Sequence, residues 1–235
     1  MHCSVTSKSI PGGWREQRVT VGTRIFELVV PADPDEFLNQ LEVANGEHEV
    51  DPYWAALWPT ASIMAALVRN HDWPPRIEVL ELGCGSGLVG LAALAAGLQV
   101  TFSDFVPTAV ELALENARRN GLTRARGRIL DWNDAPHLQF PLVLGSDLVY
   151  DTDHHSALLN TIDNTLARDG LCWLGDPGRS TAEPFCEAAR ARDYLLQLFD
   201  AAGQPVQELE PGEFRLLALR RREATKTLEP GRRST

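Results

Sequence analysis

The chain of 235 residues is long enough for one α/β domain with a full core, and its 44% hydrophobic and 23% charged residues are ordinary for a globular protein. Its net charge of −10 argues against a nucleic-acid backbone as the main partner and favours a basic protein segment or a small cation. No apolar run approaches the roughly 18 residues that span a bilayer, and the N-terminus lacks a signal-peptide pattern. We therefore expect no nucleic acid or membrane as a partner, and a cytoplasmic location.

The cysteines give a further indication of the compartment. Cys3, Cys84, Cys172 and Cys186 form no C-x-x-C pair, and no histidine cluster has the spacing of a zinc site. This pattern predicts free thiols in a reducing cytosol and no bound metal. We also expect the chain to act as a monomer.

The N-terminal part is expected to add a small layer to the main domain. The alternating, β-branched residues 18–30 predict a β-hairpin that turns near Gly22. A short helix or loop at 37–43 follows, and then an amphipathic helix at 53–69 that is interrupted at Pro59. This layer precedes the first strand of the main sheet and could cover a ligand as a lid.

Strands and helices then alternate along the chain. We expect strands at 77–82, 99–103, 125–130, 141–146, 171–175, 194–199 and 214–219, and helices at 88–96, 106–121, 153–168 and 181–192. The alternation predicts an α/β, Rossmann-like, doubly wound fold. Its seven-stranded sheet is mostly parallel, with an antiparallel terminal strand, helices on both faces and the N-terminal layer of hairpin and helix. We assign residues 1–50 to an N-terminal extension of the same domain, 51–220 to the main domain, and 221–235 to a flexible tail.

A glycine-rich turn joins the first strand of the main sheet to the next helix. The sequence E-L-G-C-G-S-G runs from Glu81 to Gly87, and an alanine-rich helix follows. Such a turn places backbone N–H groups and a helix N-terminus beside the end of the strand, where glycines permit the close approach of a ligand. Small residues at this kind of turn can also serve packing alone. A negative Glu81 there would be unfavourable for phosphate but would suit a cationic ligand.

Acidic residues follow the next strands at their carboxyl ends. Asp104 comes about 20 residues after the glycines, a spacing at which a carboxylate can accept hydrogen bonds from both hydroxyls of a ribose. The pair Asp131 and Trp132 follows the third strand, and Asp147 the fourth. In an open α/β sheet these ends lie on one edge, so we expect the side chains to meet in one pocket. Asp131 could equally cap a following turn, and Asp147 a following helix.

The motif E-L-G-C-G-S-G, followed by the acidic Asp104, resembles motif I and the post-motif acidic residue of class I (seven-strand) S-adenosylmethionine-dependent methyltransferases. The resemblance implies S-adenosylmethionine as cofactor. It assigns Glu81, Gly83, Cys84, Gly85, Ser86 and Gly87 to cofactor binding, Asp104 and Phe105 to the ribose and adenine edge, and Asp131 and Trp132 to the adenine. Trp58 and Ser146 complete the expected cofactor site.

Further motifs narrow the resemblance to methyltransferase family 16, whose characterised members are mostly protein lysine N-methyltransferases. They are D-x-x-Y from Asp147 to Tyr150, L-W-P around Trp58, and the aspartate–tryptophan pair after the third strand. The stretches D-P-Y-W-A at 51–55 and G-D-P-G-R at 175–179 are similar to the branch that methylates the electron-transfer flavoprotein β subunit. The resemblance covers roughly residues 51–192 and implies a lysine-bearing protein substrate.

The expected chemistry gives two residues a catalytic role. Methyl transfer is an in-line displacement in which positioning and desolvation carry most of the catalysis. We expect Asp147 to orient the acceptor amine and Tyr150 to shape its pocket, with Tyr53, Trp54 and Trp58 as further aromatic walls. A small-molecule N-methyltransferase of the nicotinamide type, acting on a small amine, and a non-catalytic scaffold that binds the cofactor are the alternatives.

Three other features bear on the expected chemistry. The stretch after the fourth strand holds no asparagine–proline–proline–tyrosine tetrad, which argues against methylation of glutamine or adenine amino groups. His154 and His155 are adjacent on a predicted helix and diverge by about 100°, so they cannot both face one site, and we interpret them as solvated. Asp176 and Arg179 could line the substrate entrance or pair with each other.

Overall fold

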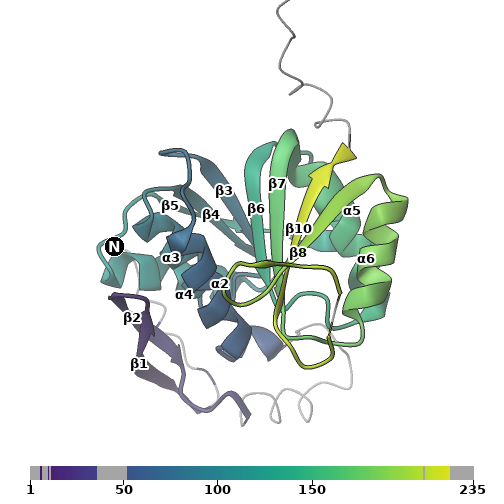
Figure 1. Cartoon of the computed structure of the whole chain (residues 1–235). Helices are drawn as coiled ribbons and strands as arrows, with labels where there is room; N and C mark the ends of the chain where they lie inside the picture. Colours follow the sequence, from purple (N-terminus) through teal and green to yellow (C-terminus); the bar gives the residue numbers. More distant parts are fainter. Residues whose placement is uncertain (1–5, 7–9, 11, 36–51, 209, 223–235) are drawn as a thin grey trace, which may run out of the picture.

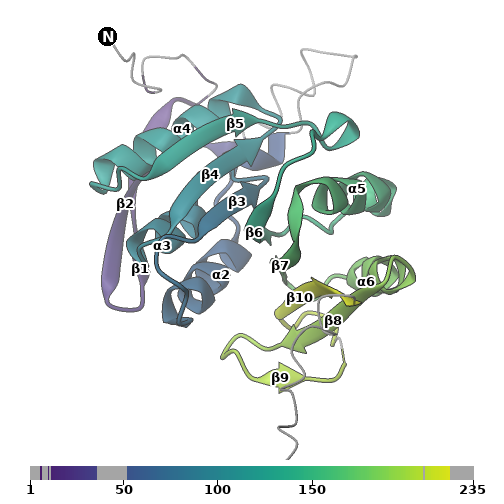
Figure 2. The same cartoon turned by 90° about the horizontal axis from the view of Figure 1, so that it is seen from above.

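The computed structural model describes residues 6, 10, 12–35, 52–208 and 210–222. Its centre is an eight-stranded sheet in the order β5-β4-β3-β6-β7-β10-β8-β9 (Figures 1 and 2). These strands are β5 (Ala125–Ile129), β4 (Gln99–Asp104), β3 (Glu78–Leu82), β6 (Phe140–Ser146), β7 (Leu166–Asp176), β10 (Arg215–Arg221), β8 (Tyr194–Phe199) and β9 (Pro205–Val206). The first five are parallel, and β10 is antiparallel to both of its neighbours. The predicted fold class is confirmed, with the two-residue edge strand β9 as an eighth strand.

Helices cover both faces of this sheet, as Figure 2 shows. One face carries α2 (Pro59–Asn70), α3 (Leu88–Ala95) and α4 (Pro107–Arg119), and the other carries α5 (His155–Thr165) and α6 (Ala182–Ala191). Alternate strand residues enter the two cores: Val79 belongs to the first, and Leu80 to the second. Burial on both faces explains why the central strands read as continuous apolar runs. Within the described ranges, no helix is both long and apolar enough to cross a membrane.

The N-terminal hairpin pairs β1 (Trp14–Val21) with β2 (Arg24–Pro31) as a separate two-stranded sheet beside α4. Side-chain amides of α4 take the place of a neighbouring strand. Asn116 Oδ1 accepts the N–H of Val29 at 2.7 Å, and its Nδ2 donates to the Val29 carbonyl at 3.1 Å. The same Nδ2 donates to the carbonyl of Ser86 at 2.9 Å. Asn116 therefore ties the hairpin to the glycine turn.

Several element boundaries differ from those predicted. Pro59 is the first residue of α2, and the residues before it form a separate 3-10 turn, η2 (Pro52–Ala55), because proline suits the first helical turn but not the interior. The helix predicted to reach residue 168 ends at Thr165, because Leu166 is extended, buried and paired with Phe140 at the start of β7. β10 continues to Arg221, one residue into the predicted tail. The predicted element at 37–43 lies outside the described residues.

Candidate active site

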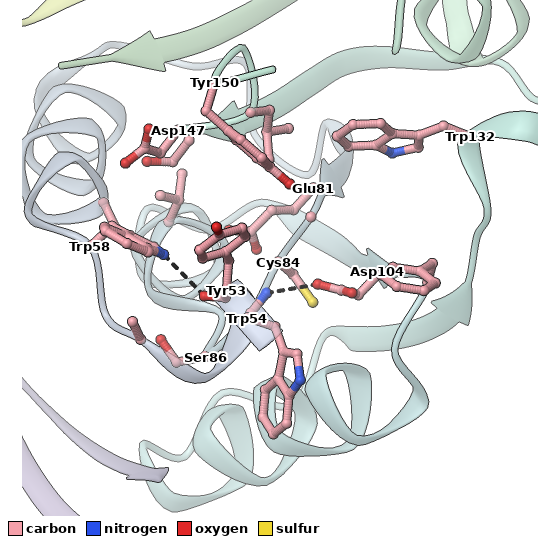
Figure 3. Close-up of a pocket in the computed structure, with 18 of the residues that line it drawn as sticks. Tyr53, Trp54, Trp58, Glu81, Cys84, Ser86, Asp104, Trp132, Asp147 and Tyr150 are labelled. Atoms are coloured by element: carbon pink, nitrogen blue, oxygen red, sulfur yellow. Dashed lines mark hydrogen bonds between the residues drawn. The ribbon is translucent and has the colours of Figure 1, made fainter. Parts of the chain in front are cut away.

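The glycine turn forms one wall of the candidate site. Gly83, Gly85 and Gly87 all have positive φ (55°, 49° and 83°), a conformation that other residues rarely adopt. Asp104, at the end of β4, fixes the middle of the turn, because its Oδ2 accepts the N–H of Gly85 at 3.1 Å (Figure 3). Its Oδ1 accepts the N–H of Val106 at 3.0 Å. The 20-residue spacing noted in the sequence therefore corresponds to a direct contact between the turn and the acidic residue.

A cavity of about 670 Å³ opens at this edge of the sheet. A volume of this size suits a ligand as large as a nucleoside with an amino acid tail. Thirteen of the fourteen predicted site residues line it: Trp58, Glu81, Gly83, Cys84, Gly85, Ser86, Asp104, Phe105, Asp131, Trp132, Ser146, Asp147 and Tyr150. They come from the ends of separate strands and from the segment before α2, as the topology predicts. The structure therefore brings these residues together, while their individual roles remain proposals.

Gly87 is the predicted residue that does not line the cavity. It precedes α3, and a Cβ added to it would lie 2.7 Å from the Cβ of Ala113 on α4. The third glycine of the turn thus serves close packing between the turn and a helix. This is the packing interpretation left open for such turns.

Glu81 lies behind the turn and is 3% exposed. Its Oε2 accepts the backbone N–H of Gly90 at 3.0 Å. Burial raises the pKa of Glu81 to about 8, an effect that the Gly90 hydrogen bond opposes and the nearby Asp104 charge reinforces. The raised pKa favours the protonated form of Glu81 over the negative form that the sequence suggested. A cation in the cavity would favour the ionised form.

At the adenine end of the expected site, Asp131 and Trp132 begin the 3-10 turn η3 (Trp132–Asp134). Asp131 Oδ1 accepts the N–H of Asn133 at 2.8 Å, so the capping interpretation of Asp131 is confirmed. The other carboxylate oxygen of Asp131, Oδ2, takes no part in this hydrogen bond. Phe105 is exposed on the cavity wall, where an aromatic ring can cover a bound base.

An aromatic group lines the other end of the cavity. Tyr53 makes an edge-to-face contact with Tyr150, their ring centroids 5.5 Å apart, and lies 6.1 Å from the ring of Trp58. The indole N–H of Trp58 donates to the carbonyl of Tyr53 at 3.0 Å (Figure 3). Trp54 also lines the cavity, but its indole packs in a buried cluster against α4, so its role as an aromatic wall stays a prediction. Tyr53, Trp58 and Tyr150 are hereafter called the aromatic trio.

Asp147 follows β6 beside the aromatic trio and has a left-handed backbone, with φ of 60°. It does not cap the following helix; the nearest side-chain cap is Asp151, which accepts the N–H of Asp153 at 2.9 Å and begins the 3-10 turn η4 (Thr152–His154). The carboxylate of Asp147 is held by the guanidinium of Arg179, which reaches it from the loop after β7. Arg179 therefore pairs with Asp147 through its side chain, while its backbone N–H donates to Asp176 Oδ1. Neighbouring Ser146 Oγ is buried with no hydrogen-bond partner among the described residues.

The solvated interpretation of the two histidines is confirmed for one of them. His155 is 6% exposed and packs edge-on against Phe185 of α6, so the interpretation is wrong for it. His154 has a side chain that is 54% exposed; it lines the cavity, with its Nε2 3.7 Å from Asp151 Oδ2. Asp151 and His154 were both missed as site residues, although their place directly after D-x-x-Y is a signal that could have found them.

Comparisons with known proteins identify the family. Residues 42–184 match the model of a protein family described as lysine methyltransferase. The chain belongs to this family. Family membership implies S-adenosylmethionine as methyl donor. The buried Ser146 oxygen and the two carboxyl groups, Glu81 and Asp104, suit its hydroxyl, ammonium and sulfonium groups. Within the described part of the chain, no three His, Cys, Asp or Glu side chains are grouped to hold a metal ion.

The similar proteins include EEF1A lysine methyltransferase 3 of Mus musculus, 32% identical over 55% of this chain and 58% of the relative. The electron transfer flavoprotein beta subunit lysine methyltransferase of Danio rerio is 32% identical over 57% of this chain and 53% of the relative. The chain thus spans about half the length of the curated relatives it matches. Among solved structures, a TehB-like S-adenosylmethionine-dependent methyltransferase from Corynebacterium glutamicum has a TM-score of 0.55, with 20% identity over 78% of this chain and 93% of that one. This likeness supports the fold.

Proposed function

We propose that the protein is an S-adenosylmethionine-dependent N-methyltransferase that transfers a methyl group to a lysine side chain of a protein. The observation that carries this proposal is one cavity with two chemically different ends. Glu81, Asp104 and the glycine turn form a carboxylate-rich end for the cofactor, and Asp147 with the aromatic trio forms an end for the acceptor. Family membership supports the same assignment.

Each of the site residues has a separate role in this proposal. When bound, S-adenosylmethionine supplies an electrophilic methyl group on a sulfonium. Asp104 binds the ribose hydroxyls, and ionised Glu81 balances the positive charge of the ligand. Asp147 orients the acceptor nitrogen. A free lysine has a pKa of about 10.4, and burial among aromatic rings favours the neutral amine that can attack.

The mouth of the cavity favours a protein segment over a free small amine. Tyr53 is 47% exposed there, so one wall of the acceptor end is open to a larger partner. Asp131 and Asp151 add carboxylates to the cavity lining, and among the described residues the one ion-pair contact to either is from His154 Nε2, 3.7 Å from Asp151 Oδ2. A basic segment around the target lysine would complement this charge.

The electron-transfer flavoprotein β subunit is the first substrate to test, because the G-D-P-G-R stretch at 175–179 and the Danio rerio relative both point to that branch. We propose the cytoplasm as the compartment, since Cys84, Cys172 and Cys186 are free thiols.

The test is incubation of the protein with S-adenosylmethionine carrying a labelled methyl group, together with purified flavoprotein or a lysate from cells that lack the enzyme. Labelled protein is hydrolysed to amino acids, and the methylated residue is identified by mass spectrometry. Methyllysine is expected. Methylhistidine or methylarginine would overturn the lysine assignment, and label confined to the small-molecule fraction would establish the small-amine alternative.

A further inference from the structure

We infer that Arg179 is a positioning residue for transfer, which acts by holding the carboxylate of Asp147 in one orientation toward the acceptor. This inference rests on the proposed function, in which Asp147 orients the acceptor nitrogen. It assigns a role to the loop after β7, whose residues do not line the cavity themselves.

The contact is specific in its geometry. The Nε and Nη2 atoms of Arg179 each lie 2.8 Å from the same oxygen, Oδ1 of Asp147. The backbone of Asp147 is fixed as well, because its N–H donates to the Gly175 carbonyl at 2.8 Å. With Oδ1 held by two donors, Oδ2 lies outside the ion pair. The carboxylate therefore cannot rotate freely, and Oδ2 is the oxygen that the acceptor nitrogen would meet.

Arg179 is itself held by a rigid loop. Asp176 is fully buried, and its Oδ1 accepts the N–H of Gly178 at 2.7 Å and that of Arg179 at 2.8 Å. Gly178 has φ of 89°, and its carbonyl accepts the N–H of Gly212 at 2.9 Å. A Cβ on Gly178 would lie 2.6 Å from the Gly212 nitrogen, so only glycine permits this approach. The loop is thus pinned to the segment before β10.

The electrostatics of this group require the guanidinium. Asp147 and Asp176 are close enough that the charge of Asp147 adds to burial in raising the pKa of Asp176. The hydrogen bond to Asp147 is the main cause that raises the pKa of Arg179. One arginine thus compensates two carboxyl groups that are both largely removed from solvent. Without it, the Asp147 carboxylate would lose its two donors and face a second carboxyl group.

The experiment compares methyl transfer by the wild type, Arg179→Ala and Arg179→Lys to the protein substrate that the labelling experiment identifies. A misplacement of about 1 Å in a catalytic group can cost about 100-fold in rate, and we expect Arg179→Ala to lower kcat by that order. The affinity for S-adenosylhomocysteine, measured by calorimetry, should be unchanged because the cofactor end is intact. Added guanidinium ion should restore part of kcat in Arg179→Ala, and Arg179→Lys should retain more activity than alanine because it keeps one cationic donor.

Arg192→Ala is the matched control. Arg192 is 30% exposed against 37% for Arg179, and its Nη1 lies 3.0 Å from Asp163 Oδ2, away from the cavity residues. It should lose a side-chain ion pair at a similarly exposed arginine, with kcat unchanged. The inference is overturned if Arg179→Ala keeps the wild-type kcat, or if its loss of kcat is matched by Arg192→Ala or is not relieved at all by guanidinium. A wild-type protein that transfers no methyl group would instead refute the proposed function, before any variant is compared.

Discussion

The carboxyl group of Glu81 accepts a hydrogen bond from the backbone N–H of Gly90, with Oε2 and N 3.0 Å apart. This bond joins the end of β3 to the first turns of α3 behind the glycine turn. It leaves no space for a side chain at position 90, because a Cβ there would contact Glu81 Oε2 and the ring of Phe102. The carboxyl group of Glu81 is therefore fixed by a backbone N–H rather than by another side chain.

This environment predicts a pH dependence of stability. The pKa of Glu81 is raised from 4.5 to about 8, so between these values the folded ligand-free protein binds a proton that the unfolded chain has released. Its contribution to the free energy of unfolding is complete below pH 4.5, falls as the pH rises toward 8, and stays constant above it. Glu81→Gln, which stays neutral, should remove this fall in denaturant titrations. An unchanged pH profile in the variant would contradict the assignment.

Asn116 should be important for stability. Its replacement by alanine leaves the N–H and carbonyl of Val29 without their amide partner in a buried contact. Each such group costs about 1–3 kcal/mol. The midpoint of thermal unfolding should fall by about 2–4 °C for each kcal/mol lost, as measured by calorimetry.

Asn120→Ala is the control for Asn116. Asn120 makes the same pair of bonds to Glu27, but at the exposed end of the hairpin, where water can replace them. Its midpoint should fall much less. Equal losses for the two variants would show that burial of the Val29 contact is not the cause.

Gly87 should tolerate alanine less well than Gly97. Their φ values are similar, 83° and 93°, so both variants bear the left-handed cost of about 1–2 kcal/mol. An added Cβ meets Ala113 at Gly87 but nothing within 4 Å at Gly97. Overpacking should add about 1–3 kcal/mol to Gly87→Ala alone. Denaturant unfolding of the two variants measures the difference, and its absence would refute the packing role of Gly87.

Asp147→Asn should separate transfer from cofactor binding. The amide keeps the shape of the carboxylate but loses its charge, so we expect a fall in kcat of about 100-fold from misplacement of the acceptor. The affinity for S-adenosylhomocysteine should stay close to that of wild type. Asp151→Asn, which alters a second carboxylate on the same cavity, is the control and should have a smaller effect. Lost cofactor affinity with normal turnover would reject the role of Asp147.

The part of the site that could be predicted from sequence is the part that local geometry determines. A buried strand, a glycine turn and a helix in succession place Gly85 at the strand end, and the end of the next parallel strand places Asp104 beside it. The strand-end rule likewise brought Trp132 and Asp147 to one cavity. These inferences need only the order of strands in a doubly wound sheet.

The remaining features depend on contacts between distant segments. Arg179 and Asp147 are 32 residues apart, and no periodicity indicates that the loop after β7 turns back toward β6. The amide pairing of Asn116 with Val29 spans 87 residues. The burial of His155 was not predicted, because the residues of α5 that face the core depend on where that helix begins. Asp151 and Asp153 are both typical of a helix start, so the sequence does not fix that point.

Calorimetric titration of the wild-type protein and Asp104→Asn with S-adenosylhomocysteine tests directly whether the cofactor binds in this cavity. The wild type should show saturable binding. Loss of a charge-assisted hydrogen bond costs about 1.5–3 kcal/mol, so the variant should bind about 10–100 times more weakly while remaining folded by circular dichroism. A folded wild-type protein that gives no binding heat, or an Asp104→Asn variant that binds as tightly as wild type, would contradict the placement of the cofactor in this cavity.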